Sequence, residues 1–196
     1  MHDLEPYGRW LYLYDQSQDR LSNFYGQETP EMGCHLLYDH VIHPDWRSMG
    51  SDTLYFKILF VDESLGFSVI ELIGEWNDLI GNDIMWLKRD LIDPLLARGI
   101  DKYILMGENV LNYHGDEDSY YQEWAEESAE GWVIGMGFRE HILDEWARLG
   151  FSRYFLFGED WNDPMWRTRH PLQLYWAVSA RLFPGLDCPS QIPQLR

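Results

Sequence analysis

The sequence predicts an α/β protein with a mostly parallel, mixed sheet, helices on the faces of that sheet, and an irregular β-containing segment at the N-terminus. From residue 54 to residue 183, short runs of β-branched and aromatic residues alternate with amphipathic stretches of helical length. Helical crossovers between strands place those strands parallel to one another. With 45% hydrophobic residues, the 196-residue chain can bury a substantial core and is too apolar to be disordered.

The first 53 residues are the least regular part of the chain. Apolar and aromatic residues at Arg9–Tyr14 and His35–Ile42 predict two strands, joined by a polar loop that contains glycine and proline. We interpret residues 1–53 as an irregular N-terminal segment and residues 54–183 as the alternating core. Together they are predicted to form one domain that spans residues 1–196.

The core is predicted to begin with an antiparallel pair of strands at 54–62 and 67–74, because the intervening Glu-Ser-Leu-Gly has the length of a hairpin connection. A helix follows over residues 82–99, where apolar residues recur at helical spacing. Pro94 lies inside this helix and has no N–H to donate. We therefore expect a kink or break near Asp93.

The remaining elements continue the alternation. Ser119 and Gln122 have the spacing of a capping box, after three acidic residues, and predict the start of a short helix. Further strands are predicted at 102–107, 131–137 and 152–158, with helices over 138–150 and about 171–183. The strands after residue 66 are expected to be mostly parallel, with strand 54–62 antiparallel beside the first of them.

The formal charge of −18 comes from 33 acidic against 15 basic residues and disfavours binding to nucleic acids and to anionic membrane surfaces. The N-terminus has no basic and apolar leader pattern, and no apolar run is long enough to span a membrane, so we expect a cytoplasmic protein. Cys34 and Cys188 form no disulfide framework or C-x-x-C motif and are expected to be reduced thiols.

Three of the predicted strands end in Gly-Glu, at Glu75, Glu108 and Glu159. Because parallel strands share a carboxyl edge, where open α/β folds bind ligands, these glutamates are the main candidates for a functional site. Other candidates near that edge are Asp78, Asn109, His114, Asp160 and Asp163, with Trp76 and Trp161 as aromatic surfaces for stacking.

Several interpretations of this edge stay open. In the simplest, each Gly-Glu is a strand-to-helix turn whose carboxylate lies in water. In the first functional one, a non-enzymatic protein binds a protein partner or small molecule there. In the second, Glu75, Glu108 and Glu159 hold Mg²⁺ or Ca²⁺, with Asp78 or Asp163, and the ion activates water in a hydrolase or transferase. In the third, the abundant aromatic residues form the interface of a homo-oligomer.

No sequence motif identifies a particular chemistry or a characterised family. The chain contains no G-x-S-x-G, P-loop, G-x-G-x-x-G or H-E-x-x-H sequence. His35, His40 and His43 are spaced so that two imidazoles could meet at zinc, but no C-x-x-C or H-E-x-x-H motif accompanies them, and ordinary strand and loop positions explain them better. His141 is expected on the flank of a helix.

Overall fold

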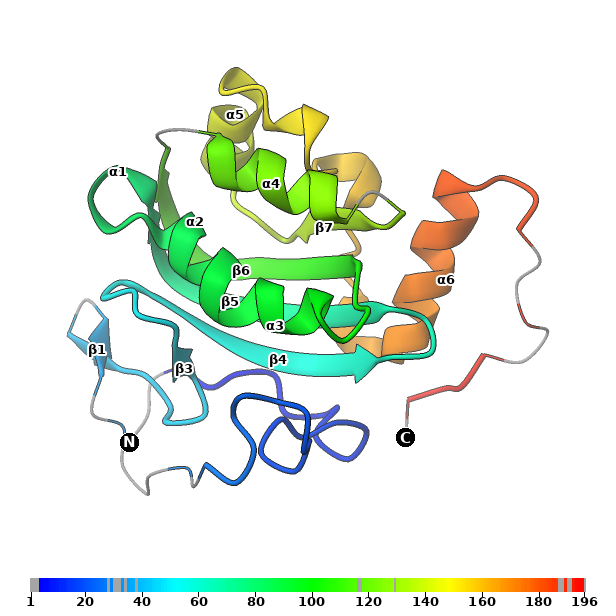
Figure 1. The fold of residues 1–196 in the computed structure, drawn as a ribbon, viewed down its shortest axis with the longest axis horizontal. Helices are drawn as coiled ribbons and strands as arrows, with labels where there is room; N and C mark the ends of the chain where they lie inside the picture. The colour runs from blue at the N-terminus through cyan, green and yellow to red at the C-terminus, as the bar shows by residue number, and fades with distance from the viewer. Residues whose placement is uncertain are drawn as a thin grey trace.

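A five-stranded mixed sheet forms the centre of the protein, in the spatial order β3-β4-β5-β6-β7, with helices packed on it (Figure 1). The computed structural model describes residues 4–27, 29, 33, 35–37, 39–115, 118–128, 130–186, 189 and 192–195. The strands are β3 (Arg47–Ser48), β4 (Leu54–Asp62), β5 (Phe67–Asn77), β6 (Lys102–His114) and β7 (Trp132–Met136). The predicted α/β class is confirmed. Within the described residues, no helix is long and apolar enough to cross a membrane.

Strand directions agree with the sequence prediction. β4 and β5 form an antiparallel hairpin, whereas β5, β6 and β7 are parallel to one another. The predicted strand at 152–158 is wrong as a full element: a 3₁₀ turn covers Phe151–Arg153, and only Leu156 forms a parallel bridge, to Ile134 on β7. The chain then turns away at Gly158, which has a φ of +100°.

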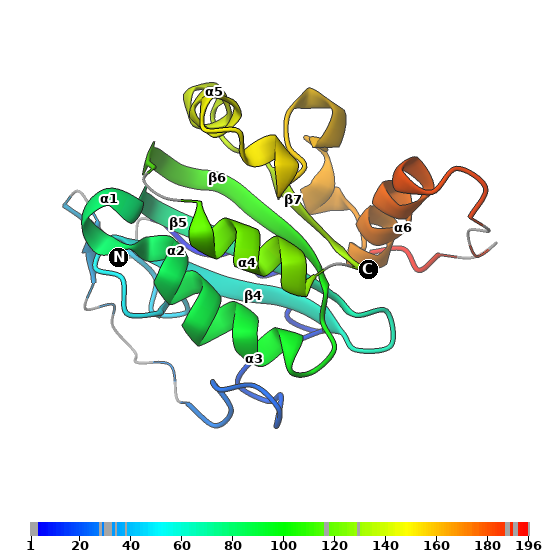
Figure 2. The ribbon, with the colours of Figure 1, turned by 45° about the horizontal axis from the view of Figure 1, so that its top comes forward.

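Most helices lie on one face of the sheet, which we call the helical face, and the last helix lies on the other, the α6 face (Figures 1 and 2). The helical face carries α1 (Asp78–Gly81), α2 (Asp83–Trp86), the π-helical turn η1 (Leu87–Ile92), α3 (Asp93–Leu96), α4 (Ser119–Glu127) and α5 (Glu140–Arg148). The α6 face is covered by α6 (Pro171–Leu182) and by part of the N-terminal segment.

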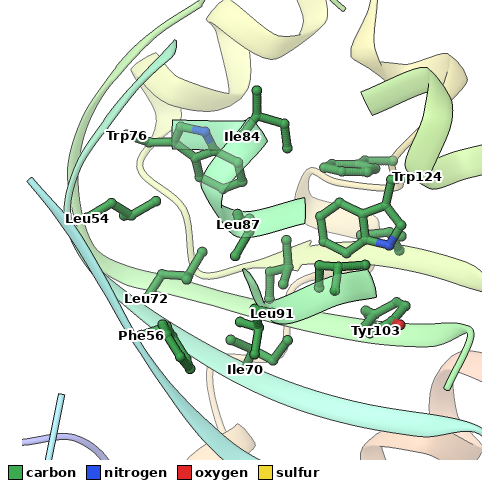
Figure 3. Close-up of a cluster of buried hydrophobic side chains, with 14 of the residues drawn as sticks. Leu54, Phe56, Ile70, Leu72, Trp76, Ile84, Leu87, Leu91, Tyr103 and Trp124 are labelled. Carbon is green, nitrogen blue, oxygen red and sulfur yellow. The ribbon is translucent and has the colours of Figure 1, made fainter. Parts of the chain in front are cut away.

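Two apolar clusters fill the space on either side of the sheet. On the helical face, side chains from β4, β5 and β6 pack against the helices (Figure 3). Trp76 and Trp124 are fully buried there. On the α6 face, Trp10 from the N-terminal segment packs with Trp166 and Tyr175. The aromatic residues therefore serve mainly as core, with five tryptophans less than 2% exposed.

The predicted irregularity before Pro94 is present as the π-helical turn η1 between α2 and α3. The N–H of Asp93 donates to the carbonyl of Lys88, five residues back, instead of four. Pro94 follows immediately and cannot donate, so the wider turn accommodates the missing hydrogen bond while the backbone stays helical.

Helix α4 begins without the predicted capping box. Asp118 is its N-cap, so Ser119 is the first helical residue and not the cap. The side chain of Asp118 makes no capping hydrogen bond. The side chain of Gln122 instead donates to Glu126 at 2.7 Å, one turn along the helix. Two of the three acidic residues before Ser119, Asp116 and Glu117, lie outside the described residues.

The N-terminal segment is less regular than predicted. Residues 9–14 form successive turns instead of a strand, because Leu13 and Tyr14 both donate to the carbonyl of Trp10. Residues 35–42 do not form one strand but the small hairpin β1 (Leu36–Leu37) and β2 (His40–Val41), which reverses at Asp39 with a φ of +63°. Tyr38 and the predicted thiols Cys34 and Cys188 lie outside the described residues.

Candidate functional site

The three Gly-Glu pairs occupy different structural positions. β5 continues to Asn77 and β6 to His114, so Glu75 and Glu108 lie within strands, and the prediction that they follow strand ends is wrong. Glu159 starts the 3₁₀ turn η3 (Glu159–Trp161). The strands continue past the glycines because the β5–β6 pairing shifts register twice, with an extra β6 residue each time.

Each glycine before a glutamate has its own structural reason. Gly74 has a φ of +119°, and a Cβ there would lie 1.9 Å from the carbonyl oxygen of Thr53. A Cβ on Gly107 would meet the Phe138 ring at 2.4 Å. Gly158 also has a positive φ, but open space surrounds it. Each of the three Gly-Glu pairs therefore has its own structural cause, and the repetition is not a shared motif.

The three glutamates have separate environments. Glu108 accepts hydrogen bonds from the indole of Trp166 at 2.7 Å and from the guanidinium of Arg167 at 2.6 Å. Glu75 accepts one from the side-chain amide of Asn112 at 3.1 Å, and Glu159 is exposed. Within the described residues, no group of three or more His, Cys, Asp or Glu side chains could hold a metal ion. The Mg²⁺ or Ca²⁺ hypothesis thus lacks a ligand set there.

Asp78, another predicted site residue, is buried in the core of the helical face. One of its oxygens accepts from the Trp76 indole and the Ile84 backbone, and the other from the hydroxyls of Tyr113 and Tyr121. Burial raises the pKa of Asp78 to about 6, against the lowering effect of these hydrogen bonds. All four bonds join separate elements, so Asp78 acts as a structural junction.

The two predicted aromatic site residues differ in accessibility. Trp76 has no exposed surface and cannot stack on a ligand, because the Asp78 junction and the surrounding rings enclose it. Trp161 is half-buried, with the Arg181 guanidinium 5.2 Å from its ring centroid.

The predicted residues Asp160, Trp161 and Asp163 come together beyond the end of β7. They line a pocket of about 240 Å³ with Arg169 and Arg181. Arg169 pairs with Asp163 and Arg181 with Asp160, so both aspartates are already neutralised. Among its described lining residues, this pocket has no unpaired charge that favours a ligand.

The remaining two predicted residues belong to β6. Asn109 is half-buried within the strand, and His114 is its exposed last residue. Neither lines the pocket beyond β7. The ten predicted residues are thus distributed over several places and do not form a single site.

Sequence reasoning missed an ionic cluster on the α6 face, in which Arg167 pairs with Glu108 and with the buried Glu71. The buried Lys57 lies opposite Glu71 in the hairpin. Glu71 is 1% exposed, accepts the backbone N–H of Tyr7 at 2.8 Å, and lies 3.5 Å from Arg167. Burial raises its pKa to about 7, although the Tyr7 hydrogen bond and Arg167 oppose the rise.

The sequence did contain a signal for this cluster. Lys57 and Glu71 each interrupt an otherwise apolar strand, in "LYFKILFVD" and "FSVIELIG", and they are direct cross-strand partners in the hairpin. Both are buried, and Lys57 reaches Asp45 at 3.5 Å. Charged residues at paired positions inside two apolar runs indicate a buried polar site.

A separate groove lies beside the carboxyl end of β6. It is lined by Leu4, Leu37, His40, Leu111, Asn112, Arg139 and His141, and its volume is about 430 Å³. These residues come from the N-terminal segment, the β1–β2 hairpin, β6 and the start of α5. The groove therefore forms only when four distant parts of the chain are assembled, which explains why sequence spacing did not reveal it.

The groove is predominantly apolar with a few polar groups at its border. His141 Nε2 donates to the Leu111 carbonyl at 3.1 Å, and Asn112 is held by Glu75. β7 accompanies β6 only as far as Met106, so within the described chain the carboxyl half of β6 has a strand neighbour on one side only. This shortened pairing leaves room for the groove beside the start of α5.

Comparisons with known proteins do not assign this site. No family model and no curated protein matches the chain. One solved structure, a Thermotoga maritima protein described as a candidate anti-sigma factor antagonist, superposes with a TM-score of 0.42 at 14% identity, over 56% of this chain and 87% of that protein. At this level of similarity, the comparison supports no statement about function.

Proposed function

We propose that the protein is a non-enzymatic binding protein that holds a small molecule, or a protein partner, in the groove at the carboxyl end of β6. The observation that carries this proposal is the groove itself. Its volume of about 430 Å³ is within the range of roughly 300–1,000 Å³ that is typical of small-molecule sites, and its lining is mainly apolar with a few polar groups. Such a lining favours ligands with an apolar body.

The chemistry of the groove supports binding more than catalysis. Its described lining includes two histidines and an arginine, but no carboxylate, serine or cysteine that could act as a nucleophile. Two carboxylates elsewhere are engaged: the buried Asp78 by four neutral donors, and the partly exposed Glu108 by Arg167 and Trp166. Two expectations from the sequence stay predictions: that the protein forms a homo-oligomer through its aromatic residues, and that it does not bind nucleic acids.

The proposal is tested by titrating the ¹⁵N-labelled protein with three probes of equal shape: 3-phenylpropionate, 3-phenylpropionamide and 3-phenylpropylamine. We expect at least one probe to shift the backbone amide signals of Leu111, Asn112 and His141. Leu111→Asn should weaken that binding, whereas the matched control Leu79→Asn, at an exposed leucine outside the groove, should not. Signals that stay unmoved at the groove with all three probes would contradict the proposal.

A further inference from the structure

Arg139 differs from most of the other cationic side chains in this acidic protein. Most of the described lysines and arginines lie within ion-pair distance of a carboxylate. The Arg139 guanidinium is exposed and makes no hydrogen bond or ion pair with any residue that the structure describes. Among the described residues, Arg20 also lacks a carboxylate partner, but only Arg139 of the two lines the groove.

This arginine borders the groove rather than the open surface. It immediately precedes α5 and lines the groove beside Leu111 and His141. The Nε2 of His141 is held by the carbonyl of Leu111, which fixes the ring next to the apolar wall. One end of the groove thus combines a free guanidinium with an ordered imidazole, and the rest of its lining is largely leucine.

From this arrangement we infer that the groove selects ligands with an apolar body and a carboxylate group, and that Arg139 is the residue that recognises the negative charge. The inference rests on the proposed function of the groove. A guanidinium matches a carboxylate through two parallel hydrogen bonds, and leucine side chains contribute the apolar contact.

The negative charge of the whole protein does not oppose this selection strongly. Charges in water are screened over about 8 Å at physiological salt, so an anion at Arg139 responds mainly to nearby groups. Of the neighbouring acids, Glu75 is hydrogen-bonded to Asn112, and Glu140 is exposed on the first turn of α5. Both carboxylates keep their charge, but neither lines the groove, and Arg139 is the one permanently charged side chain in its described lining.

The test uses the same three probes with the full chain at pH 7.5 and fixed ionic strength, with dissociation constants from the NMR titrations. We expect 3-phenylpropionate to bind about tenfold more tightly than the amide, and the amine to bind most weakly. Arg139→Met should abolish the preference for the carboxylate without changing affinity for the amide. Arg139→Lys should retain much of the preference, and Arg20→Met, at an exposed arginine outside the groove, should behave as wild type.

The possible outcomes separate this inference from the proposed function. If the carboxylate and the amide shift groove signals with equal affinity, the charge selection is wrong and the proposed function stands. If the preference survives in Arg139→Met, the assignment to Arg139 is wrong. If no probe reaches the groove, both proposals fail. Melting curves of the variants verify that each is folded, which is expected because Arg139 is exposed.

Discussion

Two of the buried carboxylates, Asp78 and Glu71, lie at opposite faces of the sheet and are satisfied by different means. Asp78 lies on the helical face and receives four hydrogen bonds from uncharged donors. Glu71 lies on the α6 face, where its partners are the backbone of Tyr7 and the charged side chain of Arg167. Burial raises the pKa of both, to about 6 and about 7.

Because both pKa values are raised, both carboxylates make stability depend on pH, and the difference lies in where their partners come from. The donors to Asp78 belong to β5, α2, β6 and α4, so its network is internal to the core. The donors to Glu71 come from the N-terminal segment and from the half-exposed Arg167. Glu71 therefore depends on segments that cover the sheet from outside, and its charge is opposed by the nearby Glu108.

The largest effect is expected for Asp78→Ala. Removal of the carboxylate leaves the Trp76 indole, the Ile84 backbone and two tyrosine hydroxyls without their acceptor, and each unsatisfied buried donor costs about 1–3 kcal/mol. Tyr113 and Tyr121 lie 3.2 Å apart and can partly compensate each other. We expect the free energy of unfolding to fall by about 3–4 kcal/mol and the melting temperature by about 10 °C.

Urea denaturation measures this effect. Glu159→Ala is the control, because that carboxylate is exposed and a surface substitution usually changes stability by less than about 0.5 kcal/mol. A loss below about 1 kcal/mol in Asp78→Ala would show that the Asp78 network is not a structural junction. The contrast with Glu71 would then have no basis.

A smaller, pH-dependent effect is expected for Glu71. Its folded pKa of about 7 lies above the ordinary value of 4.5, so between these values the native state binds a proton that the unfolded state has released. The contribution of Glu71 to stability is therefore lost as pH rises through this interval, by about 3 kcal/mol in total. Glu71→Gln carries no titratable group and should show no such loss.

The measurement compares unfolding free energies of wild type and Glu71→Gln from pH 4 to pH 8. The difference between the two proteins should shift by about 3 kcal/mol in favour of the variant as pH rises, whatever constant offset the amide introduces. Glu159→Gln, on an exposed side chain, supplies the matched control. A flat difference for Glu71→Gln would mean that Arg167 and the Tyr7 backbone fully offset the effect of burial on Glu71, so that its pKa is not raised.

The elements of the sheet were more predictable than the ionic cluster and the groove. Periodicity located strand 54–62 and helix 171–183 to within a residue, because burial of one face imposes a regular pattern. Strand lengths were underestimated at Gly74 and Gly107, because the sequence does not show that these glycines make room for Thr53 and Phe138 while β5 and β6 continue past them. Such contacts join residues far apart in sequence.

The functional residues were less predictable because their roles depend on assembly. Gly-Glu at residue 108 looked like a strand end with a free carboxylate, but Trp166 and Arg167, almost 60 residues later, supply its partners. The groove likewise combines Leu4 and Leu37 with Leu111 and Arg139. No local pattern marks these pairings. By contrast, the charges of Lys57 and Glu71 inside apolar strands were visible in the sequence, but they were not interpreted as a buried polar site.

The smallest effect is expected for divalent cations, and it sharpens the account of the ionic cluster. Arg167 already supplies positive charge to Glu108 at 2.6 Å and to Glu71 at 3.5 Å, and Glu75 and Glu159 do not join them in a ligand set. At matched ionic strength, Mg²⁺ or Ca²⁺ should therefore shift the melting temperature by less than about 1 °C relative to chelator. An ion present at about 100 times its dissociation constant would add roughly 2.7 kcal/mol, or about 5–10 °C. A rise of that size in wild type, absent from the combined Glu75→Gln, Glu108→Gln and Glu159→Gln variant, would show that a cation and not Arg167 is the partner of these carboxylates.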